Sequence, residues 1–123
     1  MKIAYWITTV LFCLLMTFSA YAYLSGGAQV VDGFHHLGYP DYFRQALGVA
    51  KILGVLSLLV PLVPPTLREW AYAGFAFDLI AAAVSHSASG DGASKAIPPL
   101  VILGILLVSQ QLWHRLAPKT AAA

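Results

Sequence analysis

Two residues of opposite charge, Lys51 and Asp78, lie inside long hydrophobic stretches of this sequence. A charge inside lipid costs about 3 kcal/mol or more, so one that is retained usually has a partner or a task. A lysine and a carboxylate at low dielectric have movable pKa values and can exchange a proton with a ligand. The pair therefore indicates either a salt bridge that fixes helix register or a centre for acid–base chemistry. We count Lys51 and Asp78 as candidate catalytic residues, together with His86.

A second group of polar residues precedes and follows these stretches. We interpret Arg44, His35, His36 and Tyr39 as candidate ligand-binding residues at the outer end of the protein. Histidines and carboxylates that cluster are candidates for metal or haem ligation, and His86 with one of the paired histidines has the chemistry of axial ligands. Their spacing matches no strong metal motif such as HExxH. We therefore expect neither a metal nor haem, and the cofactor stays open, with a quinone as a candidate.

The elements that must position these residues are hydrophobic segments. Of the 123 residues, 59% are hydrophobic and only 10% are charged, which leaves no room for a water-soluble domain or a basic nucleic-acid patch. Four segments, residues 3–24, 43–63, 70–88 and 96–114, are about as long as a membrane crossing requires. The sequence therefore predicts an all-α fold: a four-helix bundle in the membrane, formed by residues 1–123 as a single transmembrane domain.

The first segment also resembles a signal peptide. Lys2, an apolar run and the tripeptide Ala20-Tyr21-Ala22 resemble a signal with its cleavage site. The length of the run and the single basic residue before it favour a retained span. Cys13, the only cysteine, lies in this segment, so no disulfide forms within one chain and a CxxC-type oxidoreductase mechanism is excluded for this chain alone.

Charges at the ends of the segments predict the topology. Lys2, Arg68, Arg115 and Lys119 fall on one side, and Arg44 and Lys95 on the other. The positive-inside rule therefore predicts that both termini are cytoplasmic, as in a multi-pass protein of the bacterial inner membrane. The long connection, residues 25–42, then lies at the outer interface.

We expect this connection to be ordered rather than structureless. Long connections without structure are uncommon in small domains, and aromatic side chains favour the membrane interface. The sequence predicts that Phe34, Tyr39 and Tyr42 pack down onto the helices. The connection would then limit access to Arg44 and His86.

Helical spacing places the charged residues at related depths. Lys51 lies seven residues beyond Arg44, or about 10 Å deeper, and Asp78 lies about 12 Å below His86 on the next, antiparallel helix. Lys51 and Asp78 are thus predicted to meet. Small residues on these two helices, Ala50 and Gly54 on one and Gly74 on the other among them, predict a close approach of the backbones.

Several motifs resemble a known family. They are Leu37-Gly38-Tyr39-Pro40, residues 47–54, residues 69–75, Phe77-Asp78-Leu79 and Ser85-His86. Together they resemble the DoxX-like family of small four-helix bacterial membrane proteins over about residues 34–92. The resemblance implies a bundle in the inner membrane and, more loosely, a part in sulfur-compound oxidation coupled to quinones. Better-known members tend to have a glutamate in the second helix where this chain has Lys51.

These observations leave three hypotheses for function. The first is an accessory subunit of a quinone-linked membrane redox system, with a membrane or periplasmic protein partner. The second is a membrane enzyme that uses Asp78 with Lys51 or His86 for acid–base chemistry, of the isomerase, cyclase or hydrolase type, on a lipophilic small molecule. The third is a structural or assembly partner without a small-molecule site. A cavity beside Asp78 would favour the second, and a closely packed bundle the third.

Overall fold

Hydrophobic runs separated by proline and glycine form α-helices along almost the whole of this chain. The computed structural model describes residues 2–60 and 62–116, and within them all regular structure is α-helical, so the all-α prediction is confirmed there. The helices are α1 (Lys2–Ser25), α2 (Ala28–His36), α3 (Asp41–Leu59), α4 (Pro65–Ala88) and α5 (Ala93–Leu116).

Proline sets two boundaries that differ from the prediction. The second long helix was predicted to reach residue 63, but α3 ends at Leu59 and Val60 is extended, with φ −80° and ψ 120°. Pro61 follows in the sequence, and the residue before a proline disfavours helical geometry. The third was predicted to begin at residue 70, but α4 begins at Pro65, because proline fits the first position of a helix.

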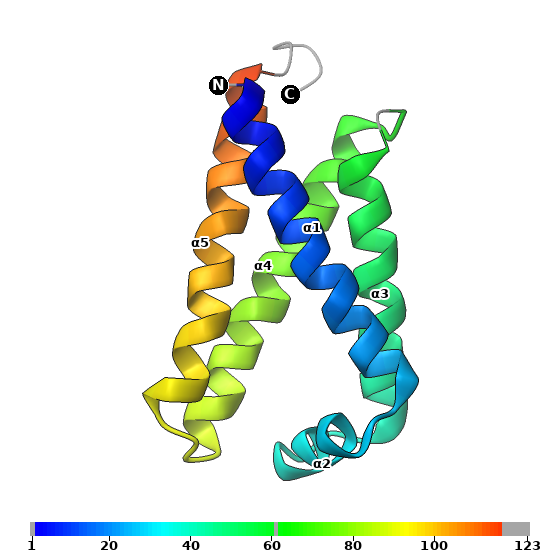
Figure 1. Ribbon diagram of the computed structural model, residues 1–123, viewed down its shortest axis with the longest axis vertical. Coiled ribbons are helices and arrows are strands. Elements are labelled where there is room, and N and C mark those ends of the chain that lie inside the picture. The colour runs from blue at the N-terminus through cyan, green and yellow to red at the C-terminus, as the bar shows by residue number, and fades with distance from the viewer. Residues whose placement is uncertain (1, 61, 117–123) are drawn as a thin grey trace.

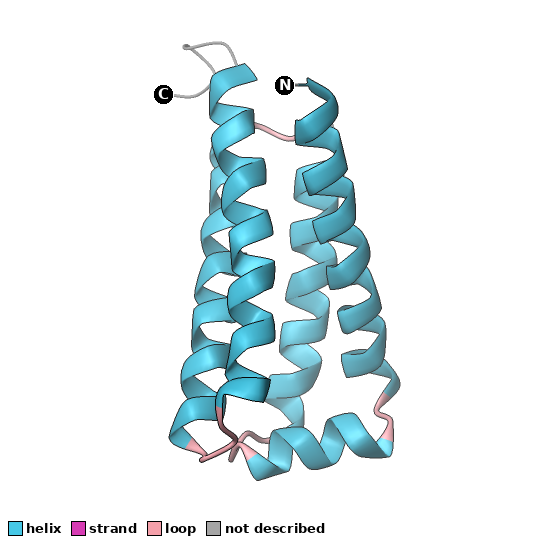
Figure 2. Cartoon of the chain, turned by 60° about the vertical axis from the view of Figure 1, so that its left-hand side comes forward, coloured by secondary structure: helices cyan, strands magenta, loops and turns pink. Residues whose placement is uncertain are grey.

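Four long helices run along the structure and the short one crosses an end. The start of α1, the end of α5 and the turn between α3 and α4 lie at one end, with α2 at the other (Figure 1). Figure 2 shows α2 lying across the ends of the long helices. α1 packs against α3 and α5, and α4 packs against α5. α3 and α4 contact each other less extensively, and this seam holds the candidate site.

The connection after α1 is ordered, and its aromatic residues behave differently from one another. Phe34 is buried and packs edge-on against Tyr23, with 4.9 Å between the ring centroids, as predicted. Tyr39 is half-buried. The prediction is wrong for Tyr42, which is 75% exposed because it lies in the first turn of α3 on the side that faces away from the other helices.

The core combines aromatic packing with one buried polar cluster. Phe12 and Phe75 meet edge to face, with ring centroids 4.9 Å apart and planes at 82°. Nearby, the Ser109 hydroxyl lies 2.6 Å from that of Thr9 and 2.8 Å from that of Tyr72. These bonds join α1, α4 and α5 in the half of the structure that is distant from α2.

Three of the described helices, α1, α3 and α5, are long and apolar enough to cross a membrane. α4 has the same length as α1, but Asp78, His86 and its serines lower its hydropathy. Its assignment as a fourth span is therefore a proposal. Lys119, one of the charges in the topology argument, lies outside the described residues.

Candidate functional site

Lys51 and Asp78 face each other across the seam between α3 and α4. The Nζ atom of Lys51 lies 3.7 Å from Oδ2 of Asp78, and the two side chains are 6% and 19% exposed. Lys51 also donates a 2.7 Å hydrogen bond to the Ser19 hydroxyl and lies over the Tyr23 ring, 3.9 Å from its centroid. Its ammonium group therefore links α3 to α1 as well as to α4.

A cavity of about 530 Å³ lies between this ion pair and α2. Its walls come mainly from apolar and aromatic side chains of α2, α3 and α4, among them Phe34, Leu37, Phe43 and Phe77. Its polar lining residues include Tyr39, Asp78, Ser85 and His86. An apolar hollow with a few converging polar groups is typical of a small-molecule site.

A second hollow of about 320 Å³ continues along the same seam toward the other end of the helices. Lys51, Ser57 and Trp70 contribute to its lining, and Asp78 and Gly74 border both hollows. The Asp78 carboxylate thus lies where the two spaces meet.

The small residues of the seam do not pack as closely as predicted. A methyl group added at Gly54 would lie 2.5 Å from Cε2 of Phe75, so this glycine accommodates an aromatic ring rather than a helix backbone. At Gly74 an added methyl group would meet nothing within 4 Å. The seam is therefore open at Gly74, because the Phe75 ring occupies the space between the two helices.

Asp91 joins two of the predicted site residues, His86 and His36, beside the cavity of about 530 Å³. Its Oδ2 lies 2.7 Å from Nδ1 of His86, and its Oδ1 lies 2.6 Å from Nε2 of His36. These two hydrogen bonds hold the pKa of the Asp91 carboxyl below its ordinary value, and the bond to His86 has the larger effect. The carboxylate thus ties α2 to the end of α4.

The backbone at the end of α4 positions this carboxylate. Gly90 has φ +78°, and the N–H groups of Gly90 and Asp91 donate to the carbonyls of Ser87 and His86. This pattern is a Schellman motif, in which a glycine in the left-handed conformation reverses the chain. It brings Asp91 back beside the residue whose imidazole it contacts.

The same motif ends α2 and positions Tyr39. Gly38 has φ +87°, and the N–H groups of Gly38 and Tyr39 donate to the carbonyls of His35 and Phe34. The Tyr39 hydroxyl then lies 2.5 Å from the Ser85 hydroxyl of α4. Two side-chain contacts, from His36 of α2 and from Tyr39 just after it, therefore join this part of the chain to the end of α4 and the turn that follows it.

Arg44 and His35 lie apart from this cavity. The Arg44 guanidinium is buried against the end of α1, where it donates to the carbonyl of Tyr23. It satisfies a terminal helix carbonyl, as Arg68 does at the end of α3 by donating to the carbonyls of Leu58 and Val60. His35 is exposed and pairs with Asp41 at 3.1 Å. The structure therefore brings together Tyr39, His36 and His86. Arg44 and His35 lie elsewhere.

The candidate site residues predicted from the sequence did not include Asp91, Ser85 or Ser19, although Asp91 was expected at the same outer end as the histidines. The signal for Asp91 was present, since a glycine directly after a helical run predicts a left-handed cap that turns the next residue back. For Ser19 we find no comparable signal. Within residues 2–60 and 62–116, no three histidine, cysteine or acidic side chains gather in a way that could hold a metal ion.

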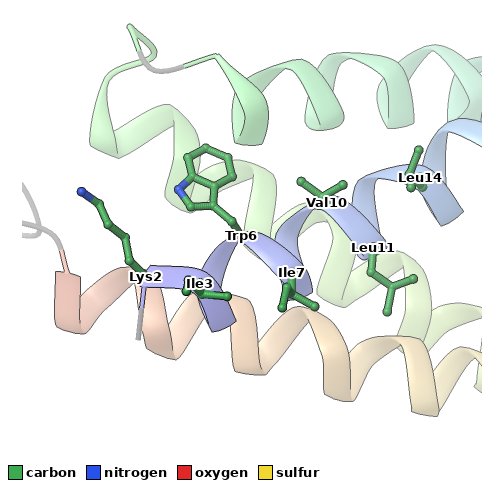
Figure 3. A pocket seen from close by; sticks show the side chains of 7 residues that line it. All are labelled: Lys2, Ile3, Trp6, Ile7, Val10, Leu11 and Leu14. Carbon is green, nitrogen blue, oxygen red and sulfur yellow. The ribbon is translucent and has the colours of Figure 1, made fainter.

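A third hollow, of about 610 Å³, lies on the outward face of α1 (Figure 3). It is lined by Lys2, Ile3, Trp6, Ile7, Val10, Leu11 and Leu14. Apart from Lys2 at its end, the lining has no ionisable group. This surface suits contact with lipid chains better than chemistry.

The chain matches the model of the DoxX-like family over residues 7–109 and belongs to that family. The match includes nearly all of the long helices as well as α2, and so extends beyond the central region that carried the resemblance. No curated protein and no solved structure matches the chain. Family membership and three apolar helices together identify a membrane protein.

Proposed function

We propose that this member of the DoxX-like family binds a lipophilic small molecule beside Asp78 and carries out acid–base chemistry on it, of the isomerase, cyclase or hydrolase type. The observation that carries the proposal is the cavity of about 530 Å³, in which Asp78 and His86 meet apolar and aromatic walls. A bundle that served only as a structural or assembly partner would gain stability by filling this space.

The residues suggest how a proton would move. The Asp78 carboxylate takes a proton from a carbon or hydroxyl group of the ligand. The Lys51 ammonium, which lines the adjoining hollow 3.7 Å from that carboxylate, stabilises through its positive charge the negative charge that remains on the ligand. Return of a proton to a different ligand atom completes an isomerisation. His86, which also lines the cavity, is the second group able to accept or supply a proton.

Several features support a single four-span domain over residues 1–123, with both termini cytoplasmic, in the bacterial inner membrane. α4 exposes Ile80 and Val84 on one side, as a lipid-facing helix would, and turns Asp78 toward Lys51. Within the described part of the chain, Lys2 begins α1, Arg68 lies in the first turn of α4 and Arg115 in the last turn of α5. These helix ends lie opposite α2 (Figure 1). The positive-inside rule places that end in the cytoplasm.

An accessory role in a quinone-linked redox system is the second candidate. The rings of Phe34, Tyr39 and Phe43 lie beside one another in the cavity wall, with centroid separations of 6.1 and 4.8 Å. An aromatic wall is suited to a flat ring such as a quinone. The two candidates share the binding site and differ in what happens to the ligand there.

The test is to identify what the protein retains from the membrane and to fill the cavity by mutation. Lipophilic molecules are extracted from the full chain purified in nanodiscs and identified by mass spectrometry. Gly74→Leu should remove most of the retained molecule, because its side chain enters the space that Asp78 borders. Gly104→Leu is the matched control, since Gly104 is also an open helical glycine but lies on α5.

The outcomes separate the candidates. A retained quinone that changes oxidation state with the membrane pool would favour the redox role. A different lipophilic molecule that wild type converts and Asp78→Asn does not would favour acid–base catalysis. Equal retention by wild type and Gly74→Leu would contradict a ligand site in this cavity.

A further inference from the structure

His86 is held in a way that defines the chemistry of its ring. Its Nδ1 atom lies 2.7 Å from a carboxylate oxygen of Asp91, and an ionised carboxylate only accepts hydrogen bonds. The proton of the neutral ring therefore resides on Nδ1. The Nε2 atom is left with a free lone pair, on a side chain that lines the cavity.

We propose that Asp91 is a positioning residue that fixes His86 as the proton acceptor of the cavity, and that His36 completes this arrangement when α2 lies over the cavity. The source of the proton, a bound ligand, rests on the proposed function. The arrangement of Asp91, His86 and His36 can be tested without a ligand. Asp91 also stabilises the imidazolium that forms when Nε2 takes a proton, because its carboxylate lies against the opposite ring nitrogen.

α2 has the features of an element that can move over the cavity. Phe34 is its one buried residue, and it has few contacts with α1 and α3. Glycines with positive φ flank it, Gly26 at +69° and Gly38 at +87°. Its ties to α4 and the following turn are the His36–Asp91 contact and the Tyr39–Ser85 contact. The Oδ1 atom of Asp91 is thus bonded to His36 only while α2 lies over the cavity.

The other ionisable groups around His86 are accounted for. Asp78 lies about 12 Å deeper in the same cavity, where it pairs with Lys51. His35 on α2 pairs with Asp41 on α3, and both are exposed. Tyr39 bonds to Ser85. Of these described groups, Asp91 is the anion in contact with the His86 ring.

The experiment observes the ring nitrogens of His86 directly. The full chain is labelled with ¹⁵N-histidine in nanodiscs, and long-range ¹H–¹⁵N correlations at neutral pH report which nitrogen carries the proton. Wild type should show His86 protonated on Nδ1. Asp91→Ala should abolish this signature, and His36→Ala should reduce it, because the bond from His36 is then lost and the carboxylate is held at one oxygen only.

His35→Ala is the matched control. His35 and His36 are neighbours on α2, are 55% and 54% exposed, and each contacts an aspartate. Loss of the Nδ1 signature in Asp91→Ala would support the proposal, as would a decrease in His36→Ala but not in His35→Ala. All variants must keep the wild-type helical circular dichroism. A His86 that is protonated on Nε2 in wild type, an unchanged signature in Asp91→Ala, or equal effects of His36→Ala and His35→Ala would overturn it.

The result is independent of the ligand experiment. If Gly74→Leu retains ligand as wild type does while the His86 signature follows Asp91, the proposed function fails and the positioning role stands. If the signature does not follow Asp91 while Gly74→Leu loses its ligand, the positioning role fails and the binding site stands.

Discussion

Replacing Asp78 by alanine removes one side of the ion pair and leaves the Lys51 ammonium in a site that is almost closed to water. The side chain of Lys51 is 6% exposed, so the charge cannot regain solvent without a change in the packing of α1, α3 and α4. We expect Asp78→Ala to lower the free energy of unfolding substantially.

The magnitude follows from the distances. Unit charges 3.7 Å apart attract each other by about 4 kcal/mol at an effective dielectric constant of roughly 20. Removing one partner of a buried pair typically costs about 3 to 5 kcal/mol. The ammonium keeps its contacts with Ser19 and the Tyr23 ring, so we expect the lower end of this range, about 3 kcal/mol.

The reverse substitution should be milder. Lys51→Met leaves the Asp78 carboxylate, which borders both hollows and is 19% exposed, so water can hydrate it. We expect this variant to lose about 1 to 2 kcal/mol. The double replacement Lys51→Met with Asp78→Leu strands no charge and should recover to within about 1 kcal/mol of wild type.

The assay is unfolding of the full chain in mixed micelles, followed by loss of helical circular dichroism. Ser57→Ala is the control, since Ser57 lines the same seam but bonds only to the carbonyl of Leu53 in its own helix, and it should change stability by less than about 0.5 kcal/mol. A Lys51→Met variant that is less stable than Asp78→Ala would refute the reasoning, because it would show that the carboxylate and not the ammonium is the poorly solvated charge.

Two other predictions concern the ends of the helices. A cysteine that replaces Asp32 should react with an impermeant thiol reagent added from outside the inner membrane, whereas one that replaces Thr66 should not. The native Cys13 is buried, so the unmodified chain gives the background reaction. The reverse labelling pattern would invert the topology. Asp91→Asn should be less stable than wild type near neutral pH, because a carboxylate whose pKa is lowered by folding contributes stability above its unfolded-state pKa of 3.8. This contribution is lost as the pH falls through the pKa of the folded state. Thermal unfolding against pH checks this, and a stability difference that persists unchanged down to about pH 2 would contradict it.

The positions of the long helices could be predicted because hydropathy reports them directly. What hydropathy missed was backbone geometry. The run of apolar residues continues past Leu59, so the composition alone did not show that the helix stops before Pro61. α2 was expected only as an ordered connection, because its nine residues depend on packing by Phe34 and on the cap at Gly38 rather than on a strong apolar pattern.

The candidate site was predictable where it depends on the depth of a residue along its helix. It was not predictable where it depends on the direction in which a side chain points. Counting residues is enough to bring Lys51 and Asp78 to the same depth. It does not tell which neighbour a side chain near a helix start contacts, and Arg44 contacts the end of α1 instead of the cavity. The contact between His36 and Asp91 joins residues 55 positions apart, and only the packing of α2 across the helix ends creates it.

The seam between α3 and α4 explains why an ion pair and a cavity occur together. Small residues at Gly54 and Gly74 would let the helices meet, but the Phe75 ring fills the space against Gly54 and keeps them apart. One turn closer to α2, Lys51 and Asp78 bridge the gap that remains. The ion pair is thus a polar link across a seam that side-chain packing leaves open. Because the opening already exists, the ligand that we propose would reach Asp78 without separating the two helices.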